Sequence, residues 1–287
     1  MLEYVDKIVG AIELDPEVTT REAAFDRLRV LGLDDFGELL LSMPNPAYPK
    51  LASLLPHMAS DEVQQNWTGA SGLSLLRQTC DFVRSTAYNF VRLTKGDLDK
   101  ATILDYGCGY GRILRIMRYF VAGKNLYGVD PWDRSLELCR NCGLSENLFL
   151  SNYLPVDLPV GNVRFDLIYA FSVFTHTSDQ ATRASLNVLR NYIKDNGLLV
   201  ITVRPVEFWR VLVGLGDELR KNMIERHRVA GFAFAPHDRT PIDGDITYGE
   251  TSMTVDWIRD NFRRWHVAGI DRSFDDSLQL YVFLQPA

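Results

Sequence analysis

Residues 103–111 read ILDYGCGYG, a short apolar run that passes through Asp105 into glycines at positions 107, 109 and 111. Glycines let the backbone turn sharply and approach a ligand closely. A strand is expected before this loop and a helix after it, so the free N–H groups of the helix N-terminus would lie behind the glycines. Ligands of an open α/β sheet bind outside the carboxyl ends of its strands. The loop therefore predicts a small-ligand site.

Short β-branched or apolar runs alternate with amphipathic segments from Ala101 onward. This alternation is typical of a parallel sheet with helices on both faces. The expected strands are 102–105, 125–129, 148–150, 165–170 and 198–203, and the expected helices are 112–120, 135–142 and 179–194. Asp195-Asn196-Gly197 is expected to form the turn into the last of these strands.

The alternation breaks after Arg204-Pro205. One helix or two are expected over 206–228, with a kink near Gly214 and Gly216, and a long polar loop is expected to join a small antiparallel ribbon. The remaining elements are the ribbon strands 231–235 and 247–251, a helix over 254–262, and strands over 265–270 and 278–284. We expect an α/β fold: a Rossmann-like, seven-stranded, mostly parallel sheet with one antiparallel strand, a helical N-terminal extension and a small inserted lid or ribbon.

The first hundred residues read as helical, with candidates over 2–12, 19–31, 35–41 and 73–93. Thr19 and Glu22 have the spacing of a capping box, and Gly32 is expected to end that helix in a left-handed conformation. The N-terminus has no basic start followed by an apolar run, so no signal peptide is expected.

The bulk composition excludes several classes of protein. The chain has 287 residues, 24% of them charged, with a net charge of −6, so a long nucleic acid is a disfavoured partner. No segment approaches the roughly 20 apolar residues of a membrane span. We expect a soluble, cytoplasmic protein. Cys139 and Cys142 form a C-x-x-C pair without a second ligand pair, so two small helix residues are favoured over a redox pair or half a zinc site, and no metal is expected.

The glycine spacing narrows the choice of ligand. A dinucleotide fingerprint places a third glycine where this chain has Arg112, and no Gly-Lys-Ser or Gly-Lys-Thr of a nucleotide P-loop follows. A second expected strand ends in Asp130, whose carboxylate can accept both hydroxyls of a ribose. That acid suits NAD and an adenosyl ligand equally.

Taken together, these motifs resemble those of the class I S-adenosylmethionine-dependent methyltransferases. The segment 103–111 resembles the first motif of that family, 127–130 the second, 165–176 its fourth-strand motif and 189–203 its fifth-strand entry. The resemblance implies S-adenosylmethionine as the cofactor. It also implies two parts, a helical N-terminal extension and cap over 1–95 and a Rossmann-like methyltransferase domain over 96–287 with an insertion at about 206–252.

The resemblance implies a set of cofactor-binding residues at the ends of the first four strands. They are Asp105, Gly107, Cys108, Gly109, Asp130, Pro131, Trp132, Asn152, Ala170 and Phe171. Asp105 would hold the amino-acid end of the cofactor, Asp130 the ribose hydroxyls, and Asn152 the adenine amino group. Asn152 stands where the family usually has an acid or an amide, and the surrounding stretch departs from the family pattern.

The acceptor is less constrained than the cofactor. Methyltransferases that act on DNA or amide nitrogens resemble one another in an Asn/Asp-Pro-Pro-aromatic motif, and this chain has Ala-Phe-Ser-Val at 170–173. The favoured acceptor is a small molecule, a sugar or another hydroxylated metabolite, that is O-methylated by in-line displacement. His176, His237 and Asp238 are the candidate bases, and His176 could instead only shape the cofactor site.

Two other functions stay open from the sequence alone. One is a module that binds S-adenosylmethionine without turnover. The other is an NAD-dependent oxidoreductase, which Arg112 disfavours. Trp67 and the segment 69–72 could close over the site from the N-terminal side, or could simply pack. The sequence indicates neither the oligomeric state nor the methyl acceptor.

Overall fold

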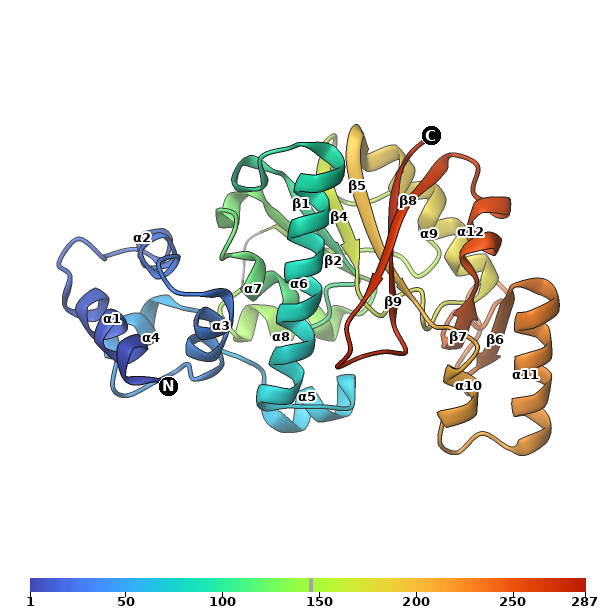
Figure 1. The fold of residues 1–287 in the computed structure, drawn as a ribbon, viewed down its shortest axis with the longest axis horizontal. Helices are drawn as coiled ribbons and strands as arrows, with labels where there is room; N and C mark the ends of the chain where they lie inside the picture. The colour runs from blue at the N-terminus through green and yellow to red at the C-terminus, as the bar shows by residue number, and fades with distance from the viewer. Residues whose placement is uncertain (145–146) are drawn as a thin grey trace.

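A computed structural model describes residues 1–144 and 147–287. Its centre is a seven-stranded sheet with the order β3-β2-β1-β4-β5-β9-β8 (Figure 1). All neighbours pair in parallel except β9, which is antiparallel to both β5 and β8. The strands are β1 (Ile103–Tyr106), β2 (Leu126–Asp130), β3 (Leu148–Leu150), β4 (Phe165–Ala170), β5 (Ile193–Val203), β8 (Trp265–Arg272) and β9 (Leu280–Pro286). The predicted fold class is confirmed.

Helices cover both faces of the sheet, which is why its central strands read as nearly continuous apolar runs. Alternate residues of β1 enter different cores: Ile103 packs with α6 and α7, and Leu104 packs with α9 and α12. Figure 1 shows α6 crossing the front of the sheet. The helices of the central domain are α7 (Arg112–Met117), α8 (Asp133–Asn141), α9 (Asp179–Tyr192) and α12 (Val255–Asn261), with short 3₁₀ turns η1 (Leu98–Lys100) and η2 (Gly123–Asn125).

Six helices precede the sheet. They are α1 (Glu3–Leu14), α2 (Arg21–Leu28), α3 (Leu33–Leu41), α4 (Pro49–Leu54), α5 (Asp61–Thr68) and α6 (Gly72–Thr94). The capping-box prediction is wrong by one residue, because Thr20 is the N-cap and its side chain accepts from the Ala23 N–H. Glu22 pairs with Arg118 instead. Gly32 is also not left-handed: its φ is −66°, and it is the N-cap of α3.

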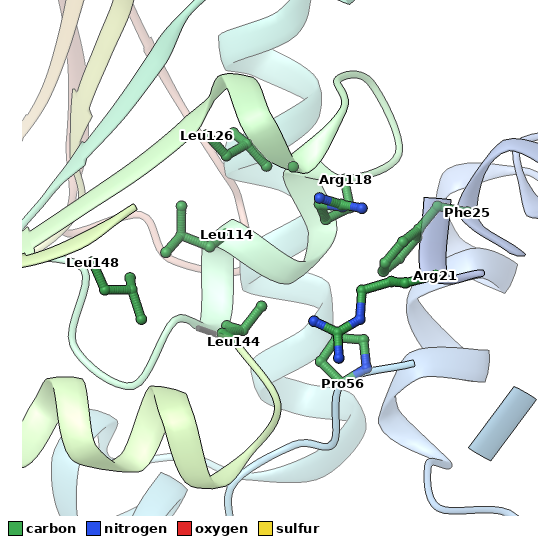
Figure 2. A pocket seen from close by; sticks show the side chains of 9 residues that line it. Arg21, Phe25, Pro56, Leu114, Arg118, Leu126, Leu144 and Leu148 are labelled. Atoms are coloured by element: carbon green, nitrogen blue, oxygen red, sulfur yellow. The ribbon is translucent and has the colours of Figure 1, made fainter. Parts of the chain in front are cut away.

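A small hollow of about 30 Å³ marks the junction between these helices and the sheet domain (Figure 2). Arg21 donates to the carbonyls of Leu54 and Gly143 there, at 2.8 and 2.7 Å. The Arg118 guanidinium lies 4.4 Å from the centre of the Phe25 ring. Such a volume holds about one water molecule. The hollow is therefore part of the interface between the N-terminal helices and the sheet domain, and Arg21 and Arg118 make contacts across it.

An insertion separates β5 from α12. It contains α10 (Phe208–Val211), α11 (Asp217–Ala230) and the antiparallel pair of β6 (Phe232–Pro236) and β7 (Gly249–Met253). The predicted ribbon and the two helices around Gly214 and Gly216 are confirmed. Trp209 anchors a separate small core and donates to the Ser252 hydroxyl at 2.6 Å. In Figure 1 this insertion and helices α1–α4 lie at opposite ends of the molecule.

Two further outcomes concern segment ends. The turn predicted at Asp195-Asn196-Gly197 lies inside β5, which begins at Ile193. The Ile193 side chain and the Asp166 carbonyl would lie within 3.0 Å of a Cβ at Gly197, so only glycine lets these segments approach so closely. Thr254 caps α12 as expected, accepting from the Trp257 N–H at 3.0 Å. Over 1–144 and 147–287, no helix is both long and apolar enough to cross a membrane.

Candidate active site

A cavity of about 830 Å³ opens at the carboxyl ends of β1, β2 and β4. Its volume lies within the range of small-molecule binding sites. One end is formed by the glycine loop 105–110 and residues 130–132. The other end is formed by the segment after β4, Arg204 after β5, residues of the insertion and Gln279. Asn66, Trp67 and Thr68 add a wall from the N-terminal helices. The position at the strand ends is where α/β sheets bind ligands.

The glycine loop turns back across the end of β2. The Gly107 and Cys108 N–H groups both donate to the Val129 carbonyl, at 2.8 and 3.0 Å. Gly107 has a φ of 74°, and a Cβ there would lie 2.4 Å from Val173. Gly109 has a φ of 54°, but no atom lies within 4 Å of its Cβ position. The space over Gly109 is therefore empty and could receive a ligand. A side chain at this position would fill that space.

Asp130 ends β2 with its carboxylate fixed by the backbone. Oδ2 accepts from the Gly109 N–H and Oδ1 from the Trp132 N–H, each at 2.9 Å. Burial raises the pKa of this carboxyl, and the two backbone N–H groups act in the opposite direction. Each oxygen keeps a second lone pair. A ribose diol could use both at once.

Asp105 presents the opposite situation. It is 2% exposed and lines the cavity, yet its Oδ2 has no hydrogen-bond partner among the described residues. Burial raises the pKa of Asp105 well above its usual range, while Tyr169 and Arg112 act in the opposite direction. A buried, unpaired carboxylate oxygen is costly. A cationic ligand group in the cavity would remove that cost.

Two tryptophans form an aromatic wall beside Asp130. The rings of Trp67 and Trp132 stack with centroids 4.7 Å apart and an interplanar angle of 22°. Trp67 also meets Tyr110 edge to face at 5.8 Å. Trp67, from α5, therefore lines the cavity and also packs against two other aromatic rings. Both of the roles considered from the sequence, closing over the site and packing, are compatible with this position.

The residues that the resemblance implies for the cofactor gather around this one cavity. Asp105, Gly107, Cys108, Gly109, Asp130, Pro131, Trp132, Asn152 and Phe171 all line it. Ala170 is not among the lining residues that the structure describes, because its side chain is buried in the core beneath β4. Its predicted contact with the cofactor therefore has no support in the geometry.

His176 lines the cavity with both ring nitrogens engaged. Nδ1 donates to the Gly249 carbonyl at 2.8 Å, and Nε2 faces the Arg204 guanidinium at 3.3 Å. Since guanidinium only donates, Nε2 must be the acceptor. Burial, followed by Arg204, lowers the pKa of His176 to about 4. The ring is therefore neutral near pH 7, and its lone pair is already in use.

This burial predicts a specific pH dependence of stability. The unfolded chain binds the His176 proton near pH 6.5 and the folded chain only near 4, so the stabilising contribution is complete above 6.5 and is lost as the pH falls toward 4. Between pH 7 and pH 5 the wild type should lose about 2 kcal/mol more unfolding free energy than His176→Gln. Urea denaturation at the two pH values measures this. His266→Gln, which removes an exposed histidine, should keep the wild-type slope, and an unchanged slope in His176→Gln would contradict the assignment.

The other two candidate bases lie outside the lining of the cavity. His237 and Asp238 are exposed residues of the loop after β6, and neither is among the described lining residues. The His237 Nε2 lies 3.2 Å from the Glu250 Oε1. Its ring centre lies 5.5 Å from that of Tyr248, which does line the cavity. His237 is therefore one residue layer away from the site.

Several lining residues were missed at the sequence level. Arg112 served there only to reject a dinucleotide fingerprint, yet it lines the cavity and lies 5.0 Å from the centre of the Phe171 ring. Arg204 directly follows β5, a position that could have pointed to it. Tyr248 and Arg239 come from the insertion, where no strand order predicts the geometry.

The cysteines give no indication of metal or disulfide chemistry. All four are free, and Cys139 is fully buried with its Sγ 3.2 Å from the Gly109 carbonyl. Among the residues that the structure describes, no group of three or more His, Cys, Asp or Glu side chains is arranged to hold a metal ion.

Comparisons with known proteins agree with this architecture. A family model described as a methyltransferase domain matches residues 75–237. A structure from Pyrococcus horikoshii OT3 is 10% identical, with a TM-score of 0.51 over 72% of this chain and 90% of its own. The glycopeptide N-methyltransferase MtfA, solved with S-adenosyl-L-methionine, is 11% identical, with a TM-score of 0.50 over 73% and 94%. Both show a shared fold, and no curated protein matches the chain. Since the family model covers more than half of it, this chain belongs to the methyltransferase domain family and is a class I S-adenosylmethionine-dependent methyltransferase.

Proposed function

We propose that this enzyme transfers the methyl group of S-adenosylmethionine to a small molecule, with a hydroxyl oxygen as the favoured acceptor atom. The observation that carries the proposal is the continuity of the cavity. It extends from Asp130 and the glycine loop to His176, Arg204 and Tyr248, well beyond the residues proposed for the cofactor. One cavity therefore offers room for the donor and the acceptor side by side.

The residues at the donor end suit the cofactor. The unpartnered Asp105 oxygen would take the cofactor's ammonium group, and Asp130 would take the ribose hydroxyls. The adenine would lie beside Pro131 and Trp132, with Asn152 near its amino group. The open space over Gly109 would receive the methionine part, with Gly107, Cys108 and Phe171 alongside.

The cofactor supplies a methyl group on a cationic sulfur, which an acceptor displaces in line. The protein's share of the work is alignment and exclusion of water. Trp67 from the N-terminal helices and Tyr248 from the insertion form walls on two sides of the cavity. We propose that these residues limit the access of water to the reacting groups.

A hydroxyl acceptor must also lose its proton at or near the transition state. We propose that His176 positions the site, because its Nε2 already accepts from Arg204, and that His237 takes the proton. Glu250 lies at the Nε2 of His237, so it can hold that N–H and leave Nδ1 as the free acceptor. His237 must move inward with its loop to reach the acceptor. Within the described residues 1–144 and 147–287, no contact supports a separate role for Asp238.

An acceptor screen with radiolabelled methyl donor tests this proposal. Small-molecule extracts and defined hydroxylated compounds should yield a labelled product. His237→Gln should lower kcat at least tenfold with little change in KM or donor affinity. Tight donor binding without any labelled product would favour a binding module. Labelled product on nitrogen alone, or full turnover in His237→Gln, would overturn the O-methylation mechanism.

A further inference from the structure

Three arginines line the cavity beside its two carboxylates, Asp105 and Asp130, which the cofactor would meet. Arg112 directly follows the glycine loop, and its charge acts on Asp105. Arg204 and Arg239 lie beside Tyr248, and the charge of Arg204 is balanced by Glu250. The arginines therefore differ in how far protein acids neutralise them.

Two of these arginines are held by other protein groups. Arg204 pairs with Glu250, donates to the Thr175 carbonyl at 3.0 Å and lies 4.0 Å from the centre of the Phe208 ring. Arg112 donates to the Gln78 and Thr79 side chains at 3.0 and 2.6 Å. Their donors serve mainly to fix the walls of the cavity.

Arg239 is different. It is exposed, and among the described residues no hydrogen bond or ion pair within 4 Å joins its guanidinium to another side chain or carbonyl. The neighbouring acid, Glu250, is occupied by Arg204 and His237. The Arg239 guanidinium lies 4.2 Å from the centre of the Tyr248 ring, and its charge also acts on Tyr153.

The contact with Tyr248 fixes the position of the Arg239 guanidinium. Tyr248 also stacks on His176, with ring centres 4.9 Å apart and planes 5° apart. His176 is in turn fixed by the Gly249 carbonyl and Arg204. Tyr248 therefore contacts both a fixed imidazole and the Arg239 guanidinium, and it holds the N–H donors of Arg239 at the cavity wall.

We infer that the methyl acceptor carries an anionic group, a carboxylate or a phosphate, and that Arg239 is the residue that selects it. The inference rests on the proposed function, since it assigns the acceptor class of the same site. A planar guanidinium binds such oxyanions through two parallel hydrogen bonds. The anion is also attracted by the cationic sulfur of the donor. Arg239 would therefore raise the affinity for the acceptor and would take no part in the methyl transfer itself.

Binding of small anions tests this without knowledge of the acceptor. Protein saturated with S-adenosylhomocysteine would be titrated with inorganic phosphate, benzoate and the neutral control benzyl alcohol, with binding followed by ligand-observed NMR. We expect at least one anion to bind more tightly than benzyl alcohol. Phosphate and benzoate distinguish a phosphorylated acceptor from a carboxylic acid.

Variants make the test specific. Arg239→Ala should weaken the anion at least tenfold, the loss expected for a charge-assisted hydrogen-bonded pair, and Arg239→Lys should recover part of it. Arg210→Ala removes an equal charge from an exposed position of α10 outside the cavity lining and should leave binding unchanged. Failure of both anions to bind, or equal losses in Arg239→Ala and Arg210→Ala, would overturn the inference. Failure of S-adenosylhomocysteine itself to bind would instead overturn the proposed function.

Discussion

Asp105→Asn is expected to stabilise the cofactor-free protein and at the same time weaken cofactor binding. The wild-type carboxyl group is 2% exposed and has one oxygen without a partner, so the empty protein bears the cost of burying an acid, which its raised pKa reflects. An amide cannot ionise, and the unfolding free energy at pH 7 should rise by about 1–3 kcal/mol. The cofactor's ammonium group loses its ionic partner, so donor affinity should fall roughly tenfold to a hundredfold. Urea denaturation and calorimetry measure the two effects.

Asp130→Asn is the matched control, because it makes the same chemical change one strand away. Asp130 accepts from two backbone N–H groups, and an amide can accept from only one of them while turning an N–H toward the other. This variant should therefore be less stable than the wild type as well as weaker in donor binding. Equal destabilisation by both substitutions would mean that Asp105 has a partner in the empty protein, and would contradict the proposed ammonium site.

Gly109→Ala is expected to abolish most donor binding at a small cost in stability. The residue has a φ of 54°, which costs an alanine about 1–2 kcal/mol. The new methyl group meets no protein atom within 4 Å, so the fold should persist. It would project into the space proposed for the cofactor, and donor affinity should fall on the order of a hundredfold. Thermal denaturation and calorimetry separate the two effects.

Gly161→Ala provides the corresponding control. Gly161 has a φ of 64° and also has no atom within 4 Å of its Cβ position, but it does not line the cavity. Both variants should show a similar loss of stability, and only Gly109→Ala should lose donor affinity. Wild-type affinity in Gly109→Ala would place the cofactor elsewhere.

The central sheet and the donor end could be predicted because their signals are local. A buried parallel strand reads as an apolar run, and the carboxyl ends of neighbouring strands meet at one edge. Asp105 lies in β1 near its carboxyl end, Gly109 is in the loop after it, and Asp130 is the last residue of β2. The order of the strands then brings them together, with Asp130 accepting from the Gly109 N–H across 21 residues of sequence.

Predictions failed where a distant contact outweighed a local preference. Glu22 was expected to close a capping box with Thr19, but the helix begins one residue later with Thr20 as its N-cap, and Glu22 pairs with Arg118, 96 residues away in the sequence. The role of His176, a candidate base or a residue that shapes the site, depends in the same way on distant groups, because Arg204 and the Gly249 carbonyl lie at its two ring nitrogens. Arg239 carried no sequence signal, because its position depends on the rings of His176 and Tyr248, which come from two other segments of the chain.

Calorimetric titration of the wild-type protein with S-adenosylmethionine and, separately, with NAD tests the central claim most directly. A glycine loop without a third dinucleotide glycine, an unpaired Asp105 and a backbone-fixed Asp130 predict one saturable site for S-adenosylmethionine and no measurable heat from NAD. Tight binding of NAD without binding of S-adenosylmethionine would contradict the account.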